Sequence, residues 1–581
     1  RYGGCANLAE TDELLGSESY VLQKVRNLET ARKFLHFIDR FKERVAWHGT
    51  TAEGNPSGGN KFRGLYNIAI KSIGAAMKRD PEVRLDYVID YGERMLEPGY
   101  YFMDSPGNDL ESIAGQVAAG CNMIFFVTGN GSITNFPFVP TLKIVTTSRR
   151  YDLLQKEMDV NAGAYLDGQP MEALGQETLN LTIDVASGQQ TVGEKAGHAQ
   201  VQIWRNWRQQ NSDQLENLLA KPKPKGHPIP LKATHSGFNI PEFHFQAVET
   251  EDGFSNDQIG LILPTSLCAG QIARMATDRL NQQQLGKPDS LSRYVTLVHT
   301  EGCGASSNSQ ATYIETLLGY LSHPMVKHCL LLEHGCEQTH NDYMWHRIKE
   351  GGIDPTKLGW ASVQLDGGIE PVIQKIQQWF GTQVSAVEPT TYHTVGLEAL
   401  RVGIITSDNT SPALMHILEQ ATHTIVSRGG TVIVPESSDL LSPNSLYNKA
   451  LFDDSILTAS LAYSQRAAVS GFHSMETPTG HWVETLTGLG ATGVDIIIAA
   501  IEDRPRQGHP FIPTLQITAS TDIGKQYGDD IDLWVSDNEA DGTTQLFQRL
   551  EEILNKSYIP KSYKVGNVDF QITRGLLGVS L

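Results

Sequence analysis

The sequence is poor in cysteine, in long apolar runs and in positive charge. Six cysteines among 581 residues are too few for a disulfide scaffold, so we expect a reducing compartment and a cytoplasmic protein. The longest apolar runs, such as residues 495–501, fall far short of the roughly 18 residues that span a bilayer. Lys and Arg number 47 against 66 Asp and Glu, a net charge of −19. This balance argues against nucleic-acid and membrane partners, which bind basic surfaces, but does not exclude a small anionic substrate.

Hydrophobic residues make up 40% of the chain and charged residues 19%, a composition typical of a core-forming protein. Short apolar runs such as residues 122–128 alternate with stretches such as 27–47, whose apolar residues recur at helical spacing. This alternation predicts a multidomain α/β fold, with parallel or mixed sheets flanked by helices. A Pro/Lys-rich linker at residues 221–230 and a softer boundary near residues 387–389 divide the chain.

An internal repeat is the most informative feature of the sequence. Residues 138–144 (FVPTLKI) return as residues 511–517 (FIPTLQI), and four further blocks return in the same order. We therefore expect copy one in residues 1–220, incomplete at its N-terminus, a cysteine-rich middle module in 231–388, and a degenerate copy two in 389–581. Copy two has no counterpart of the small-residue loop at residues 54–60, so we expect it to hold no working site.

Polar residues in copy one gather at the ends of predicted segments. Glu10 follows a short strand, Asp104 and Asp109 flank a Pro-Gly turn, and Lys143 lies inside an apolar strand. The loop at residues 54–60 has the composition of an anion-binding nest of backbone amides. The alternatives are a plain turn for the loop, helix capping for the carboxylates and a snorkelling lysine. The comparison with copy two favours a functional role for these polar residues, because copy two keeps the apolar scaffold but has a glutamine at the position of Lys143.

Three cysteines of the middle module each follow a predicted buried strand: Cys268, Cys303 and Cys336. Adjacent parallel strands end at the same edge of a sheet, so we expect these cysteines in one cleft. Thiolate, imidazole and carboxylate groups are ligands for iron or zinc, and His299 and Glu337 lie close by in sequence. The alternative is a set of small apolar cysteines that pack near the strand ends.

Several motifs resemble the altronate/galactarate dehydratase family, which also includes a sulfolactate sulfo-lyase subunit. They are GNPSGGNK at residues 54–61, FMDSPGND at 102–109, AGCN at 119–122, TGNGS at 128–132 and PTLKI at 140–144. The middle module is similar to the domain that precedes this one in the family. Asn130 and Phe136 depart from the arginine and the cysteine of the family pattern. The family's small N-terminal domain, with a histidine thought to be catalytic, is not found in these residues, so we expect a missing domain or subunit.

The resemblance implies a hydro-lyase that converts a sugar acid, an aldonate or aldarate, into a 2-keto-3-deoxy acid with the help of Fe²⁺ or another divalent metal. A non-catalytic sugar-acid binder or scaffold is the alternative, and a homo-oligomer is expected in either case. Our candidate catalytic residues are Glu10, Asp104, Asp109 and Lys143. The candidate substrate-binding residues are Asn55, Ser57, Asn60, Lys61, Asn122, Gly129 and Ser132. The candidate metal ligands are Cys268, His299, Cys303, Cys336 and Glu337.

Overall fold

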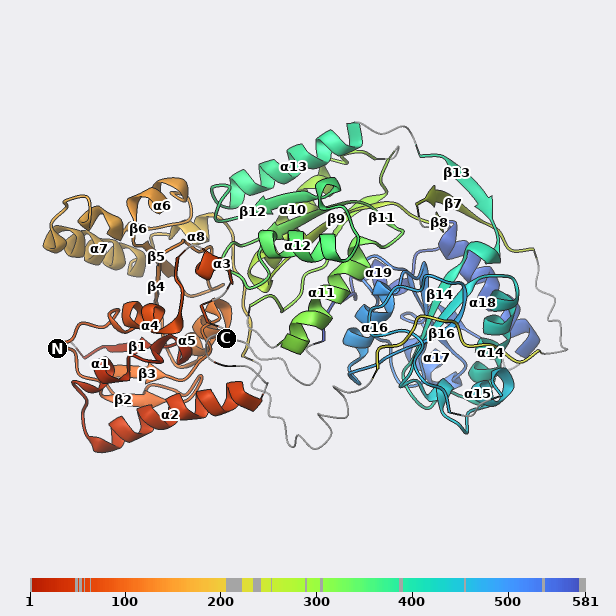
Figure 1. The fold of residues 1–581 in the computed structure, drawn as a ribbon, viewed down its shortest axis with the longest axis horizontal. Helices are drawn as coiled ribbons and strands as arrows, with labels where there is room; N and C mark the ends of the chain where they lie inside the picture. Colours follow the sequence, from red (N-terminus) through yellow and green to blue (C-terminus); the bar gives the residue numbers. More distant parts are fainter. Residues whose placement is uncertain are drawn as a thin grey trace.

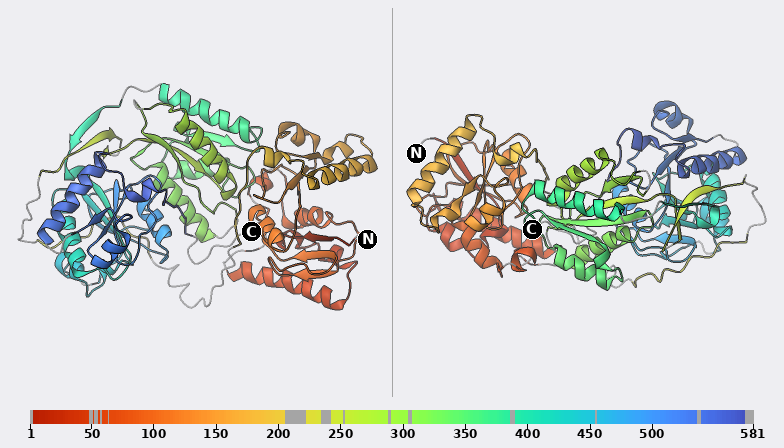
Figure 2. Two further views of the ribbon diagram at one scale, coloured as in Figure 1. Left: turned by 180° about the vertical axis from the view of Figure 1, so that it is seen from behind. Right: turned by 90° about the horizontal axis from the view of Figure 1, so that it is seen from above.

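The computed structural model shows three α/β bodies in a row, with the middle module between the two copies (Figure 1, Figure 2). It describes residues 3–47, 51, 55–56, 58–62, 64–204, 222–233, 242–251, 253–287, 290–303, 307–385, 390–453, 456–535 and 539–573. Of the candidate site residues, Ser57 lies outside these ranges. Within them, no helix is both long and apolar enough to cross a membrane.

Copy one holds two separate three-stranded parallel sheets. Their strand orders are β1 (Cys5–Leu8), β3 (Gly99–Met103), β2 (Tyr87–Ile89), and β4 (Ile124–Thr128), β5 (Thr141–Val145), β6 (Val160–Asn161). The helices are α1 (Glu18–Leu22), α2 (Leu28–Trp47), α3 (Gly58–Phe62), α4 (Ile68–Ala76), α5 (Asp109–Ala118), α6 (Ser148–Leu153), α7 (Met171–Ala186) and α8 (Val192–Lys195). The apolar stripe of α2, which includes Phe34, Phe37 and Phe41, packs on Phe102 of β3.

The middle module is one four-stranded parallel sheet in the order β10 (Arg293–Thr296), β9 (Ile259–Pro264), β11 (Val326–Glu333), β12 (Gly359–Ser362). Strand β9 (IGLILP) is buried along its whole length, because helices cover both faces of the sheet. These helices are α10 (Gly270–Gln282), α11 (Ser307–Leu321), α12 (Asn341–Glu350) and α13 (Ile369–Ser385). The predicted parallel neighbours are confirmed, so the loops after β9, β10 and β11 leave the same edge.

Copy two contains a six-stranded parallel sheet in the order β16 (Gly471–Met475), β15 (Thr431–Pro435), β14 (Arg401–Thr406), β17 (Ile496–Ala500), β18 (Thr514–Thr518), β19 (Leu533–Trp534). In chain order this is 3-2-1-4-5-6, the arrangement of a doubly wound sheet. Its helices are α14 (Pro412–Ser427), α15 (Leu446–Leu451), α16 (Trp482–Ala491), α17 (Thr521–Tyr527), α18 (Glu539–Leu554) and α19 (Lys561–Lys564).

A small antiparallel sheet joins the middle module to copy two. Its order is β13 (Tyr392–Val395), β7 (Phe245–Thr250), β8 (Gly253–Ser255). Phe243, Phe245 and Ala247 pack into the core of copy two with Leu546 and Phe547 of α18. The structure therefore places residues 243–247, which the sequence assigns to the middle module, with copy two.

The sheets of the two copies share their strand register. Cys5 pairs with Gly99 in copy one, and the corresponding residues Thr431 and Gly471 pair in copy two. The pairings of Ile124 with Thr141 and of Ile497 with Thr514 correspond in the same way. The fold class expected from the sequence, multidomain α/β with a duplicated domain, is confirmed.

Candidate active site

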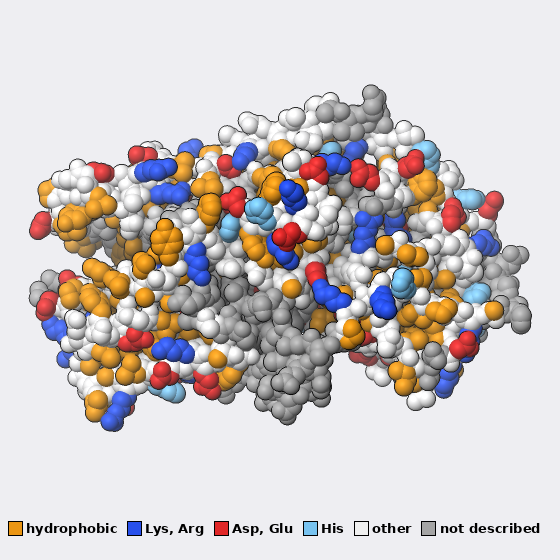
Figure 3. Space-filling model, viewed as in Figure 1, with side chains coloured by type: hydrophobic (Ala, Val, Ile, Leu, Met, Phe, Trp, Pro, Cys, Tyr) orange, Lys and Arg blue, Asp and Glu red, His pale blue; other side chains and the backbone are white. Residues whose placement is uncertain are grey.

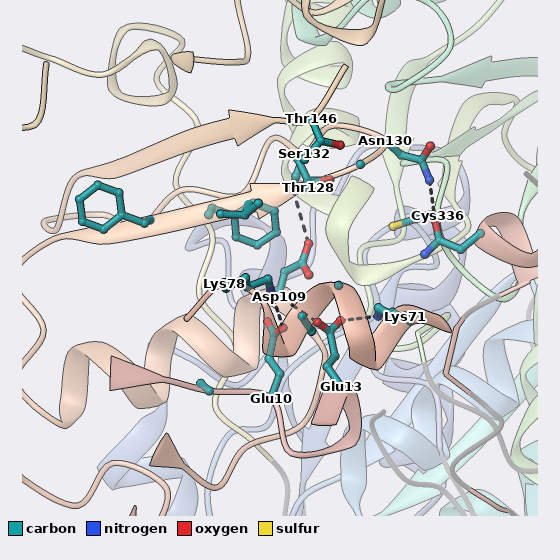
Figure 4. Close-up of a pocket in the computed structure, with 18 of the residues that line it drawn as sticks. Glu10, Glu13, Lys71, Lys78, Asp109, Thr128, Asn130, Ser132, Thr146 and Cys336 are labelled. Atoms are coloured by element: carbon teal, nitrogen blue, oxygen red, sulfur yellow. Dashed lines mark hydrogen bonds and ion pairs between the residues drawn. The ribbon is translucent and has the colours of Figure 1, made fainter. Parts of the chain in front are cut away.

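A cavity of about 400 Å³ opens where the carboxyl ends of β1 and β4 approach the middle module (Figure 4). In parallel α/β sheets, ligands bind at this edge, because the loops that follow the strands converge there. Of the candidate residues, the cavity wall includes Glu10, Asp109, Asn60, Gly129, Ser132 and Cys336. Residues that the sequence analysis had not singled out complete the polar wall: Glu13, Lys71, Lys78, His334 and Gln364.

Two carboxylates that follow β1 face two lysines from α4 and the turn after it (Figure 4). The Lys71 ammonium makes a close ion pair with Glu13. Lys78 Nζ lies 3.6 Å from Glu10 Oε2 and 3.5 Å from Glu13 Oε2. The sequence contained a sign of this lysine pair. Lys71 and Lys78 lie seven residues apart, about two helical turns, in a stretch that is otherwise largely apolar, so a helix would place them on the same side.

The surroundings push the pKa values of the two carboxyl groups apart. Burial, followed by the charge of Glu13, raises the pKa of Glu10 well above its usual range. Burial also opposes ionisation of Glu13, but Lys71 and Lys78 outweigh it and lower the pKa of Glu13 to about 2. Glu10 therefore favours its protonated form while Glu13 is ionised, which is the division expected of an acid and its charged neighbour.

Asp109 is the first residue of α5 and faces the same cavity. Burial and the charge of Glu13 raise its pKa to about 6. Its Oδ2 accepts hydrogen bonds from the hydroxyls of Ser132, at 3.4 Å, and Thr134, at 3.3 Å. A carboxyl group with a pKa this close to neutral is suited to gain and lose a proton during turnover.

Asn55 supports the lysine side of the cluster without lining the cavity. Its Oδ1 accepts a hydrogen bond from Lys71 Nζ at 2.7 Å, and its Nδ2 donates to Asp12 Oδ2 at 2.5 Å. Burial and the charge of Glu13 raise the pKa of Asp12 to about 6. Asn55 thus fixes the position of Lys71 and reaches the cavity only through it.

Two candidate catalytic residues of copy one, Asp104 and Lys143, are not among the residues that line the cavity. Asp104 is buried, makes an ion pair with Arg40 at 2.5 Å and accepts a hydrogen bond from Thr11 at 2.5 Å. The Lys143 ammonium is buried without a hydrogen-bond partner, and burial lowers its pKa although Glu157 opposes this. The catalytic roles of Asp104 and Lys143 stay predictions.

The described part of the loop at residues 54–60 docks onto the middle module. The Gly58 amide donates to Gln338 Oε1 at 3.0 Å, and the Gly59 amide donates to the Glu337 carbonyl at 3.1 Å. A Cβ at Gly59 would lie 2.6 Å from the Gly335 carbonyl oxygen, so only glycine fits this approach. These two amides therefore donate to the middle module across the domain interface. In the anion-binding nest expected from the sequence, they would instead donate to a bound anion.

Asn60, the next residue, does reach the cavity. Its Oδ1 accepts a hydrogen bond from Asn130 Nδ2 at 2.7 Å, which ties α3 to the loop after β4. Lys61 and Asn122 do not line the cavity, and Asn122 is exposed at the amino end of β4. Substrate binding by either residue stays a prediction.

The middle module brings its three loop cysteines together. Cys268 and Cys303 share a side-chain hydrogen bond, and both interact electrostatically with Cys336. His334 Nδ1 lies 3.3 Å from Cys336 Sγ, and both residues line the cavity. The hydrogen bond with Cys303 and then burial raise the pKa of Cys268, and burial raises that of Cys336, so these thiols are protonated unless a cation replaces the proton.

Among the described residues, one set of three potential metal ligands lies close together, and it contains only one of the three loop cysteines. His299 Nε2 lies 2.8 Å from the Pro264 carbonyl oxygen, and His299 Nδ1 accepts from the Glu301 amide. Ligand-type atoms of His334, Cys336 and Glu337 lie within 4.8 Å of one another. The Glu337 carboxylate, however, already accepts hydrogen bonds from two hydroxyls and two backbone amides. Of this set, the Cys336 thiol and the His334 imidazole are the donors that suit iron or zinc.

Comparison with known proteins identifies the origin of two of the three bodies. Residues 1–209 match the family model described as D-galactarate/Altronate dehydratase, C-terminal. Residues 256–388 match the model described as D-galactarate dehydratase/Altronate hydrolase, second domain. The candidate site therefore lies between two modules that share one family.

Individual relatives match copy one. Altronate dehydratase of Escherichia coli (strain K12) is 32% identical over 204 residues, or 35% of this chain and 41% of that protein. The (2R)-sulfolactate sulfo-lyase subunit beta of Chromohalobacter salexigens is 29% identical over 206 residues, or 35% of this chain and 53% of the relative. Galactarate dehydratase (L-threo-forming) of Escherichia coli (strain K12) is 28% identical over 193 residues, 32% of this chain and 36% of the relative. The chain thus spans between 36% and 53% of these relatives, and by its two matched modules it belongs to the altronate/galactarate dehydratase family.

Proposed function

We propose that this chain is a hydro-lyase that removes water from a sugar acid, an aldonate or aldarate, to give a 2-keto-3-deoxy acid. The observation that carries the proposal is the pair of carboxyl groups with opposite protonation states, Glu10 and Glu13, beside two lysines and Asp109. Dehydration of a 2,3-dihydroxy acid needs one group to remove the C2 proton and another to protonate the departing C3 hydroxyl. The names of the relatives support this class of reaction.

The lysines supply the positive charge that an anionic substrate needs. Lys71 and Lys78 both line the cavity while remaining partly exposed to solvent, and their neighbouring carboxylates raise the pKa of each ammonium, so both stay charged. Their positive charges would offset the electrostatic cost of burying a substrate carboxylate beside them. The same charges would stabilise the enolate that forms when C2 loses its proton.

Asp109 is our candidate for the base. With a pKa of about 6 it is largely ionised at neutral pH, and the hydroxyls of Ser132 and Thr134 orient its carboxylate. Glu10 is our candidate for the acid, because its raised pKa favours the protonated form and it faces the same cavity. Once the hydroxide has taken the Glu10 proton, water leaves and the enol rearranges to the 2-keto acid.

Ferrous iron is part of the proposal, and the residues that would hold it are Cys336 and His334, with Cys268 and Cys303 beside them. Bound there, the metal would act as a Lewis acid toward a substrate oxygen. Protein purified without oxygen should contain about one iron per chain by elemental analysis, and Cys336→Ser should lower that content.

The test of the function is a panel of hexonates, hexarates and sulfolactate, incubated anaerobically with ferrous iron and the protein. Formation of a 2-keto-3-deoxy acid, detected by ¹H NMR, would support the hydro-lyase. Saturable binding of one of these acids without any product would support the alternative, a sugar-acid binder or scaffold. The replacement of family residues by Asn130 and Phe136 is the observation that keeps this second candidate in view.

A further inference from the structure

A second cavity lies in copy two, beside strand β18. It has a volume of about 280 Å³ and opens between the loop after β17, strand β18 and the helices α17 and α19. On the face of the molecule in Figure 3, Lys and Arg side chains lie on the surface around α19, where copy two meets the middle module (Figure 1). This cavity is separate from the candidate active site, because no described residue lines both.

Matching hydrogen bonds locate the counterpart of this cavity in copy one. The backbone amide of Gln516, in β18, donates to Asp532 Oδ2 at 2.9 Å. In copy one the backbone amide of Lys143, in β5, donates to Asp159 Oδ2 at the same distance, 2.9 Å. Gln516 therefore takes the place of Lys143, as the repeat in the sequence predicts, and the residues around the two positions can be compared one by one.

In copy one the corresponding surface is covered by the middle module. Gln364 Nε2 donates to the Gly131 carbonyl at 2.6 Å, and the Ile369 amide donates to Glu157 Oε1 at 2.9 Å. Gln364 and Glu157 are both buried by this contact. Copy one thus uses this surface to dock a loop of the middle module.

Copy two leaves the same surface open. By the repeat, the counterparts of Gly131 and Glu157 are Arg504 and Asp530, which both line the cavity and are exposed. The middle module contributes none of the described residues of the cavity wall. The cavity is therefore the counterpart of a docking surface without its protein partner, and a small molecule can enter it.

The cavity wall carries hydrogen-bond donors that the protein does not use. Within the described ranges, no ion pair or hydrogen bond engages the Arg504 guanidinium. Gln516 is 1% exposed, and its Oε1 accepts a hydrogen bond from the Arg506 amide at 2.8 Å, which leaves the Nε2 donors for the cavity. The Ser562 hydroxyl is buried in the wall and has no hydrogen-bond partner. A buried polar group without a partner is costly, and a ligand that bonds to it removes this cost.

Lys561 adds a second positive charge to the wall. Its Nζ donates to the carbonyl groups of Gly528, at 2.6 Å, and Ile531, at 2.7 Å, so one of its three protons is left for the cavity. A planar guanidinium beside an ammonium suits a carboxylate, to which arginine can donate two parallel hydrogen bonds. Asp530 is the one carboxyl group among the described wall residues, and it would accept from a hydroxyl group but repel a second carboxylate.

From this donor set we propose that the cavity of copy two binds a small hydroxy acid with a single carboxylate. Arg504 and Lys561 would hold the carboxylate, Gln516 and Ser562 would donate to its neighbouring oxygens, and Asp530 would accept from the hydroxyl groups. The described wall contains neither histidine nor cysteine and only one carboxyl group, so it offers no acid–base pair and the ligand would leave unchanged. This inference does not depend on the reaction proposed for copy one.

The test titrates D-gluconate, a hydroxy acid with one carboxylate, into the intact protein and follows hydrogen exchange by mass spectrometry. Exchange should slow at least threefold, and saturably, in residues 504–508 and 561–567, which form much of the wall. Galactarate, which has a second carboxylate, and inorganic phosphate should each need at least tenfold higher concentrations for the same protection. Exchange that gluconate leaves unchanged in both segments would overturn the site. Galactarate or phosphate that protects as well as gluconate would overturn the proposed class of ligand.

Arg504→Ala should weaken the binding of gluconate at least tenfold, because the variant loses the charge that holds the carboxylate. Arg428→Ala is the matched control, since Arg428 is also exposed in copy two but does not line the cavity, and it should bind gluconate as the unchanged protein does. Full protection in Arg504→Ala, or an equal loss in Arg428→Ala, would overturn the proposal.

Asp530→Asn tests the selectivity of the cavity. Because this variant no longer repels a second carboxylate, galactarate should protect the two segments at concentrations within threefold of those for gluconate. Arg504 and Asp530 are both exposed, so we expect both variants to fold, and circular dichroism checks this. An unchanged preference for gluconate in Asp530→Asn would contradict the role of Asp530 in selecting a single carboxylate.

Discussion

Glu10 and Glu13 are identical side chains three residues apart, and their surroundings shift their pKa values in opposite directions, so that Glu10 favours its neutral form and Glu13 its anionic form. Both are buried, so water does not decide their ionisation. The decisive difference is Lys71, which pairs closely with Glu13. Lys78 lies almost equally far from both carboxyl groups, 3.6 Å from Glu10 and 3.5 Å from Glu13. Sequence reasoning singled out Glu10 because it follows a strand, but it could not see that lysines more than sixty residues away would select which carboxyl keeps its proton.

Asp109→Asn should reduce turnover and make the protein more stable at neutral pH. The folded-state pKa of about 6 lies above the ordinary value, so folding favours the protonated carboxyl. Stability from this group is present below about pH 4 and is lost as the pH rises to about 6. Removing the charge should raise the free energy of unfolding at pH 7.5 by on the order of 1–3 kcal/mol. Urea denaturation of both proteins at pH 7.5 measures this difference in the free energy of unfolding. A less stable variant would show that ionised Asp109 does not destabilise the folded protein.

The pH dependence of kcat/KM should be bell-shaped. Turnover should rise as the pH passes about 6, because Asp109 must be ionised to accept the C2 proton. It should fall again at higher pH, as Glu10, whose pKa is raised, loses the proton it donates. In Asp109→Asn the acidic limb should disappear from any residual activity. If the acidic limb is unchanged in that variant, the titrating group is not Asp109. Asp12, whose pKa is also about 6, would then be the next candidate.

At the scale of elements, the short helix α3 connects copy one to the middle module. Gly59→Ala would place a Cβ 2.6 Å from the Gly335 carbonyl oxygen, a contact that the backbone must move to relieve. We expect a loss of about 2 kcal/mol or more in stability, together with a fall in kcat, because Cys336 and His334 would shift relative to Glu10.

Gly175→Ala is the matched control for this prediction. Gly175 lies inside α7, and a Cβ there meets nothing within 4 Å. Alanine should therefore stabilise the helix by about 0.5–1 kcal/mol and leave turnover unchanged. Thermal unfolding and steady-state kinetics distinguish the two variants, and equal effects of the two changes would contradict the docking role of Gly59.

Much of the element-level organisation could be predicted from the sequence, because it depends on local pattern. Apolar runs ended by glycine became strands, and the cysteines that follow three of them meet because those strands are parallel neighbours. The role of the 54–60 loop could not be predicted in this way. Its small residues are compatible with an anion nest and with close packing, and only the approach of Gly335 and Gln338 decides between these two uses.

At the scale of the whole molecule, the chain carries one domain twice and uses the copies differently. The register of the sheets is the same, yet copy one has α3 and α4 between its first strands, and α4 carries Lys71 to the cavity. Sequence comparison of the copies identified the repeat and the missing loop. It could not predict the domain interface, since the contacts of Gln364 with Gly131 and of Glu337 with Gly59 join residues hundreds of positions apart.

The measurement that tests the account most directly compares Glu10→Gln with its counterpart in copy two, Glu436→Gln, for turnover of the sugar acid that the panel identifies. Both variants replace the glutamate that follows the corresponding strand, β1 or β15. We predict that Glu10→Gln lowers kcat by about a hundredfold or more, because the leaving hydroxide loses its proton donor. Glu436→Gln should keep full activity. Equal losses in the two variants, or a loss confined to Glu436→Gln, would contradict the assignment of the active site to copy one.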